Sequence, residues 1–328
     1  QQGTLTLRDV SVADAGGARG QVSGTLKDAA GDATVDLTFD VGVVSMERLA
    51  RTLSTDVPIA PAKLGKVSLR GSASGTMQDV TLDVQLALAG GTLGLKGTAQ
   101  PLAATPVVNL AYTLDHPDAN TLLDVLAPGS TSGLGQLGAL KASGEVSTRD
   151  DGRYKTSTGI TLAGATINVI GNVDAFAAVP DLNLAIEVNH PETVALIRRI
   201  VPGYTPAGGN QGAFKFRSEL KGPTNKVAMD GIELIAGRVQ GTGTGTVDLT
   251  GGKPRVALQL GFGDVVVDPW LPEGTAKPQG AVPAVPVGSP SGGSDWSRDK
   301  IDLSGLSAVN AKVDADFRRI VYGSYVVD

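Results

Sequence analysis

Hydrophobic and polar residues alternate along most of this chain. Between Val80 and Leu88, aliphatic side chains occupy every second position, and Thr81, Asp83 and Gln85 fall between them. Successive side chains of a β-strand point to opposite faces of the sheet. The pattern therefore predicts strands with one apolar and one polar face. It recurs at Val35–Val41, Val108–Leu114, Leu182–Val188 and Val256–Phe262.

The pattern repeats along the chain with a period of about 74 residues, which is typical of a repeat architecture. His116-Pro117 and His190-Pro191 are separated by one such period. Two further sets of landmarks follow nearly the same spacing. They are Leu49, Leu123, Ile197 and Leu271, and the Ala-Gly pairs that begin at Ala15, Ala89, Ala163 and Ala236. Independent landmarks with one shared period indicate a repeat array.

Each repeat is predicted to hold about five strands and one short helix. Turn signals such as Asp150-Asp151-Gly152 separate the strands by only a few residues. Short connections favour antiparallel meanders, because parallel strands need long crossovers. We therefore expect a mostly β fold, in which repeated antiparallel meanders form a curved, groove-like sheet with an aliphatic interior. The expected repeats, of which the first is partial, cover residues 1–53, 54–129, 130–203 and 204–271.

The two histidines of the chain lie at the predicted joint between a strand and the helix. In HPDANTLLDVL the proline suits the first helical position and an acidic residue follows it, so His116 and His190 are expected at the N-cap. The corresponding positions in the first and last repeats are Gly42 and Asp264. A role in catalysis or metal binding would be missing from two of four repeats. We therefore interpret both histidines as structural corners.

The composition favours an aliphatic core and excludes several classes of protein. Hydrophobic residues make up 41% of the 328 residues, but aromatic residues only 4%. Cysteine is absent, which excludes disulfides and thiolate metal sites. The net charge of −5 comes from mixed signs, so nothing indicates binding to nucleic acid. The chain begins at Gln1 inside a predicted strand, so we expect it to be a piece of a longer protein.

The last part of the sequence differs from the repeats. Residues 272–294 are rich in Pro, Gly, Ser and Ala, which predicts an extended linker or loop. Residues 295–328 resume the strand pattern at Val309, Ala311, Val313 and Phe317. We interpret this segment as the truncated start of a further β-unit.

Three short motifs suggest chemistry but fit structural roles better. GLGQLG at Gly133–Gly138 lacks the preceding strand and following helix of a dinucleotide site, so it is interpreted as a linker. GTGTGTVDL at Gly241–Leu249 lacks a phosphate-loop lysine and is expected to be a strand. Asp314 and Asp316 are expected on a solvated strand face, because no further ligand completes a calcium site. No catalytic residue, metal ligand or cofactor site is predicted, and we expect no enzyme.

The final segment resembles a known family. In WSRDKIDLSGLSAVNAKVDADFRRIVYG the matching residues include Trp296, Ser297, Asp302, Leu303 and Ser304, followed by Tyr322-Gly323. This segment is similar to the opening of the C-terminal region of AsmA family proteins, and the glycine-rich β repeats upstream are similar too. The resemblance implies a periplasmic protein that is anchored to the inner membrane of a Gram-negative bacterium. It also implies a bridge-like lipid transfer protein that supports the lipid homeostasis of the outer membrane.

The apolar faces of the predicted strands favour the same class of function. The apolar face of every strand must be covered, either by a second sheet in a closed sandwich or by a guest in an open groove. One short helix per repeat is too small to cover the strands, which favours a groove that binds phospholipid acyl chains. The expected lipid-binding residues are Val80, Leu82, Val84, Leu86, Val108, Leu110, Tyr112, Leu114, Ile167, Val169, Leu182, Leu184, Ile186, Val188, Phe214, Phe216, Val256, Leu258 and Leu260.

A second hypothesis remains open at this point. The chain could instead be a non-enzymatic periplasmic scaffold or assembly factor for outer-membrane proteins. Its β surface would then bind protein partners of the periplasm or outer membrane in place of lipid.

Overall fold

The computed structural model describes most of the predicted repeats. The described residues are 3–15, 17–28, 33–45, 47–48, 64–76, 78–126, 129, 131, 133–251, 253–272 and 310–328. The predicted linker after residue 272 and the motif from Trp296 to Leu306 lie outside these residues. The chain divides into two compact units. The N-terminal unit comprises Gln1–Thr131, Gln136–Asn189 and Glu219–Thr224, and the C-terminal unit comprises Ser132–Gly135, His190–Ser218 and Asn225–Asp328.

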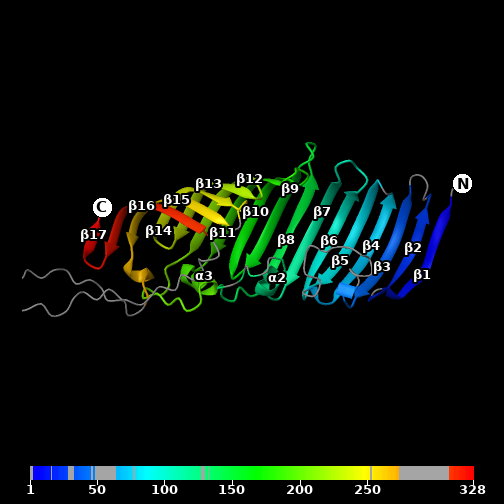
Figure 1. The fold of residues 1–328 in the computed structure, drawn as a ribbon, viewed down its shortest axis with the longest axis horizontal. Coiled ribbons are helices and arrows are strands. Elements are labelled where there is room, and N and C mark those ends of the chain that lie inside the picture. Colours follow the sequence, from blue (N-terminus) through cyan, green and yellow to red (C-terminus); the bar gives the residue numbers. More distant parts are fainter. Residues whose placement is uncertain are drawn as a thin grey trace, which may run out of the picture. The chain divides into compact units, whose positions relative to one another are not determined.

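The N-terminal unit is an antiparallel meander in which each strand pairs with the next one along the chain (Figure 1). The sheet does not close on itself, since no described residue of β1 pairs with β11. Its elements are β1 (Thr4–Ala15), β2 (Ala18–Lys27), β3 (Thr34–Val43), β4 (Val67–Thr76), β5 (Asp79–Leu88), β6 (Gly91–Gln100), β7 (Val107–His116), α2 (Ala119–Leu126), β8 (Leu140–Thr148), β9 (Tyr154–Leu162), β10 (Ala165–Asp174) and β11 (Asp181–His190).

The C-terminal unit continues with the same kinds of element. β13, β14 and β15 form an antiparallel meander, whereas β16 pairs with β15 in parallel. The long segment between β15 and β16 permits this parallel pairing. The elements are α3 (Thr193–Ile200), β12 (Phe214–Pro223, whose residues are divided between the two units), β13 (Lys226–Ala236), β14 (Val239–Asp248), β15 (Arg255–Val266), the 3-10 helix η2 (Asp268–Trp270), β16 (Asn310–Tyr322) and β17 (Tyr325–Val327).

The predicted period is visible in the element boundaries. β6, β7 and α2 each begin one period before β10, β11 and α3 respectively. Between α2 and α3 the chain forms four strands, β8 to β11, where about five were expected. The reason is strand length: these strands have nine or ten residues, so fewer of them fit into one period. The fourth joint also differs, since η2 takes the place of an α-helix.

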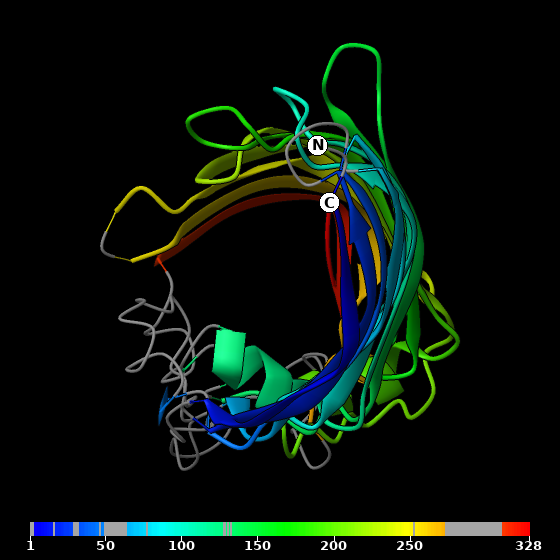
Figure 2. The same ribbon diagram turned by 90° about the vertical axis from the view of Figure 1, so that its right-hand side faces the viewer.

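Glycines in the middle of strands bend the sheet of the N-terminal unit. Gly24, Gly97 and Gly171 have φ values of +139°, +144° and +156°, a region that other L-residues rarely adopt. A Cβ atom at any of them would lie within 2.1 Å of a carbonyl oxygen on the next strand. Glycine therefore allows a sharp bend where the neighbouring backbone comes close. Figure 2 shows the resulting curvature of the strands from β1 onward.

The outer face of this sheet is polar and carries ion pairs between neighbouring strands. Arg70 pairs with Asp40 at 3.1 Å, Lys96 with Asp83 at 2.9 Å, and Lys141 with Asp115 at 3.3 Å. All six side chains are largely exposed, so solvent screens each pair and its contribution to stability is small. These pairs mark the face of the sheet that is directed to solvent.

His116 is buried at a corner between β7 and α2, with only 2% of its surface exposed. Its Nδ1 atom accepts a hydrogen bond from the backbone N–H of Asp118 at 3.1 Å. The Nε2–H group therefore donates to the carbonyl oxygen of Ala89 at 2.8 Å. Both ring nitrogens are engaged with backbone groups, which fits the structural interpretation.

The helix caps differ from the sequence prediction by two residues. Glu192, not His190, is the N-cap of α3, and its carboxylate accepts from the N–H groups of Val194 at 2.9 Å and Ala195 at 2.6 Å. His190 instead accepts the N–H of the cap residue Glu192 at 3.0 Å. The prediction placed the cap two residues too early. The acidic residue Glu192 follows the proline directly, and its carboxylate binds the free N–H groups at the helix N-terminus.

Replacing His116 with alanine should lower the free energy of unfolding by about 2 kcal/mol. The change leaves the Ala89 carbonyl and the Asp118 N–H without partners in a buried corner, and an unpaired buried group costs about 1–3 kcal/mol. Urea denaturation measures the change. Thr113→Ala is the control, because this side chain of the same strand is exposed and should change stability by less than about 0.5 kcal/mol. Equal stability of the two variants would contradict the assigned hydrogen bonds.

Candidate binding surface

The predicted lipid-binding residues all lie on strands and share one type of environment. Val80 is buried, with 6% of its surface exposed, and the other 18 are partly exposed. In the N-terminal unit they lie on β5, β7, β10 and β11. In the C-terminal unit, Phe214 and Phe216 lie on β12 and Val256, Leu258 and Leu260 on β15. Their sequence neighbours, such as Asp83 on β5 and Asn183 on β11, are exposed on the opposite face.

Strand register joins the apolar residues of the N-terminal unit into continuous rows that cross the strands. Residues paired across neighbouring strands lie on the same face of a sheet. One row runs from β4 to β11 without a charged side chain. Its members are Leu69, Leu86, Leu93, Leu114, Ala142, Ile160, Ile167 and Val188.

Some members of these rows were missed by the sequence prediction. Leu93 and Leu95 on β6 pair with Leu114 and Tyr112 on β7, and Ile160 on β9 pairs with Ile167 on β10. In GTLGLKGTAQ glycines and a lysine break the alternation, so β6 shows only a weak strand pattern. Strand register, which the sequence alone does not provide, assigns these residues to the apolar face.

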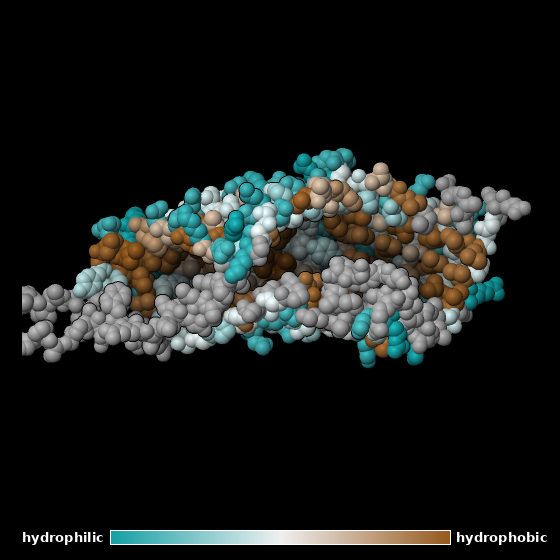
Figure 3. Space-filling model, in the orientation of Figure 1, coloured by the Kyte–Doolittle hydropathy of each residue, from teal (hydrophilic) through white to brown (hydrophobic). Residues whose placement is uncertain are grey.

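The central part of the apolar face of the N-terminal unit is not covered by other described residues. In a closed sandwich, large aliphatic side chains in the middle of strands would be fully buried. Here Leu82, Val84, Leu110 and Leu184 keep part of their surface exposed. Figure 3 shows hydrophobic residues gathered along the hollow inner surface and hydrophilic residues on the outside.

The helix α2 covers only a small part of this face. It has eight residues, of which Ala119, Leu122 and Val125 are buried. In Figure 2 it lies on the concave side, close to one end of the strands. A two-turn helix cannot shield the middle of several ten-residue strands, so the central part of each row stays open.

Glycines in the C-terminal unit make room for large side chains on β15. GTGTGTVDL forms β14, as predicted. A Cβ atom at Gly241 would lie 2.6 Å from the ring of Phe262, and one at Gly245 would lie 2.7 Å from Leu258. Phe262 also stacks on Phe317 of β16, with ring centroids 5.1 Å apart. The glycines therefore let apolar side chains of β15 pack directly against the backbone of β14.

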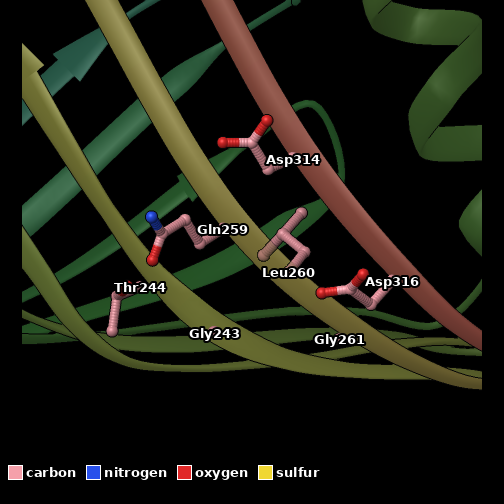
Figure 4. A pocket seen from close by; sticks show the side chains of 7 residues that line it. All are labelled: Gly243, Thr244, Gln259, Leu260, Gly261, Asp314 and Asp316. Carbon is pink, nitrogen blue, oxygen red and sulfur yellow. The ribbon is translucent and has the colours of Figure 1, made fainter.

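A shallow polar depression lies on β14, β15 and β16 of the C-terminal unit (Figure 4). Gln259 and the two carboxylates Asp314 and Asp316 line it, together with Thr244. Both aspartates are exposed, as expected for a solvated strand face. Among the described residues, no group of three or more His, Cys, Asp or Glu side chains is placed to hold a metal ion.

The motif GLGQLG follows α2 and precedes β8, as the linker interpretation predicts. The N–H of Gly135 donates to the carbonyl of Ile200 at 3.0 Å. A Cβ atom at Gly135 would lie 2.3 Å from the carbonyl oxygen of Arg199. The glycine thus serves close packing against the end of α3.

Comparisons with known proteins give no assignment for this chain. No protein-family model, curated protein or solved structure matches it. Within the described residues, no helix has the length and apolar character needed to cross a membrane.

Proposed function

We propose that the chain is a lipid conduit, in which phospholipid acyl chains bind along the apolar rows of the curved sheet. One observation carries the proposal: the N-terminal unit has a continuous aliphatic face whose central part no described residue covers. Soluble proteins rarely leave a large contiguous apolar surface open unless it binds a partner. An acyl chain is the simplest guest for a face that offers no charged group in its central rows.

The energetics favour a lipid as the guest. A phospholipid that crosses water exposes about 30 methylene groups at about 0.8 kcal/mol each, which is on the order of 25 kcal/mol. Rows of aliphatic side chains remove most of this cost and offer no single tight site. Eleven strands spaced by about 4.8 Å extend the face of the N-terminal unit over roughly 48 Å. With four strands, one repeat adds about 19 Å to this length.

The proposed setting follows the resemblance to AsmA family proteins. The chain would belong to a periplasmic protein that is anchored to the inner membrane through a segment outside this sequence. It would carry phospholipid between the inner and outer membranes and so support lipid homeostasis of the outer membrane. No cofactor and no catalytic residue is part of this proposal.

Photo-cross-linking tests which face of the sheet meets the lipid. A benzophenone amino acid is placed at Leu86 or Leu110 on the apolar face, or at the adjacent Gln85 or Ala111 on the outer face. The protein is then irradiated with vesicles of phosphatidylethanolamine and phosphatidylglycerol. We expect lipid adducts, detected by mass spectrometry, at Leu86 and Leu110 and at least tenfold fewer at their neighbours. Equal labelling of the two faces would contradict the proposal. The same variants can also be irradiated in cells, where adducts with a protein instead of lipid would favour the scaffold hypothesis.

A further inference from the structure

One place on the apolar face of the N-terminal unit is polar. Tyr112 of β7 reaches across β8 and forms a hydrogen bond with the hydroxyl of Thr158 on β9. The Oγ1 atoms of Thr158 and Thr156 are 3.2 Å apart. The three side chains are partly buried and lie in the same rows as the aliphatic residues. We refer to Tyr112, Thr156 and Thr158 as the hydroxyl cluster.

The backbone is shaped to let this cluster form. Gly144 of β8 pairs with Tyr112 on one side and Thr158 on the other. A Cβ atom at Gly144 would lie 3.0 Å from the Tyr112 hydroxyl and 2.3 Å from the carbonyl oxygen of Ser157. Because Gly144 has no side chain, the Tyr112 side chain has space to cross β8 and contact Thr158.

The cluster is specific to one repeat. Its two threonines lie one period after Leu82 and Val84 on β5. By register, the matching residues of the following repeat are Met229 and Ile232 on β13. Aliphatic side chains thus occupy the equivalent positions on both sides. The fold does not require hydroxyl groups there, which points to a role in binding.

The hydroxyl cluster has one hydrogen-bond donor available for a bound molecule. Three hydroxyl groups supply three O–H donors, and the two contacts within the cluster use two of them. Among the described residues no other hydrogen bond engages these hydroxyls, so one O–H remains for a guest. Nearby hydroxyls are different, because Tyr154 donates to the Pro106 carbonyl at 2.8 Å and Thr148 to the same oxygen at 3.3 Å.

We propose that the hydroxyl cluster binds the ester carbonyl of a diacyl glycerolipid, so that the lipid pauses with its acyl chains on the aliphatic rows on either side. This inference rests on the proposed function. An ester carbonyl is a neutral acceptor and matches the free donor. A charged phosphate binds most strongly beside Arg or Lys, but in register the cluster is flanked by the uncharged residues Gly171, Leu95 and Val169. The lysine next to Thr156, Lys155, is exposed on the outer face.

The test compares a diester phosphatidylglycerol with its diether analogue, which keeps the phosphate but lacks the carbonyls. Both lipids, mixed in equal amounts, compete for the whole protein, and native mass spectrometry counts each bound species. We expect the diester to bind about fivefold more often. In the Tyr112→Phe/Thr156→Val/Thr158→Val variant, which removes all three hydroxyl groups of the cluster, the ratio should fall to about one, with total lipid bound unchanged. Valine preserves the shape of threonine and phenylalanine that of tyrosine. Apolar residues occupy the positions equivalent to the two threonines in other repeats, so the variant should fold.

Each outcome decides between the two proposals. Equal binding of diester and diether by the unaltered protein would overturn the role of the hydroxyl cluster, since any polar contact would then lie at the phosphate. The conduit proposal would be unaffected. A preference that survives in the triple variant would also overturn the role of the hydroxyl cluster. If neither lipid binds, the conduit proposal fails and the hydroxyl cluster fails with it. Thr161→Val, on the outer face of β9, is the matched control and should keep the preference of the unaltered protein.

Discussion

Replacing Gly97 with alanine should destabilise the protein by about 4 kcal/mol. The added Cβ atom would lie 2.0 Å from the Asn109 carbonyl oxygen and 3.0 Å from the Cα atom of Leu110, so the backbone must move. The φ value of +144° adds strain of about 1–3 kcal/mol for a residue with a side chain. Because Gly97 bends β6 toward its neighbour, relieving the clash would also flatten the sheet.

A second glycine, Gly159, provides a control, because alanine at this position should not lower the free energy of unfolding. A Cβ atom added at Gly159 on β9 would have no neighbouring atom closer than 3.9 Å, and the φ of this residue is not positive. Alanine there should be neutral or stabilise the fold by up to about 1 kcal/mol, because it reduces the freedom of the unfolded chain. Urea denaturation of both variants makes the comparison. Equal and small effects would show that mid-strand glycines do not set the curvature.

Much of the fold could be predicted from the sequence, because its main signals are local. Strand alternation depends only on the two faces of a sheet, so β5, β7, β11 and β15 are clear in the sequence. The repeat period appears in both the sequence landmarks and the element boundaries. The number of strands was overestimated, because nothing in the sequence signals that most strands continue for about ten residues.

The candidate surface was only partly predictable, because it depends on pairing between strands. Leu93 and Leu95 on β6 belong to the apolar rows, but glycines hide their alternation. Thr156 and Thr158 alternate in phase with Tyr154, Ile160 and Leu162, so the pattern is consistent with the apolar face, but their hydroxyl groups kept them out of the predicted set. The contact between Thr158 and Tyr112, two strands away, follows only from the register, because Gly144 on β8 pairs with both residues. The alternation could therefore indicate the face of these residues but not that they meet in one cluster.

A glutamate in place of Leu82 should abolish lipid binding while the protein still folds. Leu82 lies in the middle of β5 on the apolar face and pairs with Ala73 on one side and Gly97 on the other. These small neighbours and the partial exposure of Leu82 give a carboxylate access to water when no lipid is bound. In a closed sandwich the same charge would be buried without a partner and would cost several kcal/mol. The open surface should therefore lose about 1–2 kcal/mol of stability and remain folded.

The effect on lipid should be much larger than the effect on folding. A carboxylate within an aliphatic row either loses its hydration when an acyl chain covers it or keeps that chain away. We expect at least a tenfold loss of bound phospholipid. Gln85→Glu on the outer face of the same strand is the control, since it adds the same charge beside Arg70, with which Gln85 pairs in register. It should leave both lipid binding and stability unchanged.

Native mass spectrometry of the unaltered protein, Leu82→Glu and Gln85→Glu after incubation with phospholipid vesicles tests the central claim most directly. Circular dichroism confirms that all three proteins are folded. The account predicts bound phospholipid on the unaltered protein and on Gln85→Glu, and little or none on Leu82→Glu. A folded Leu82→Glu variant that retains the same amount of lipid, or an unaltered protein that binds none, would contradict it.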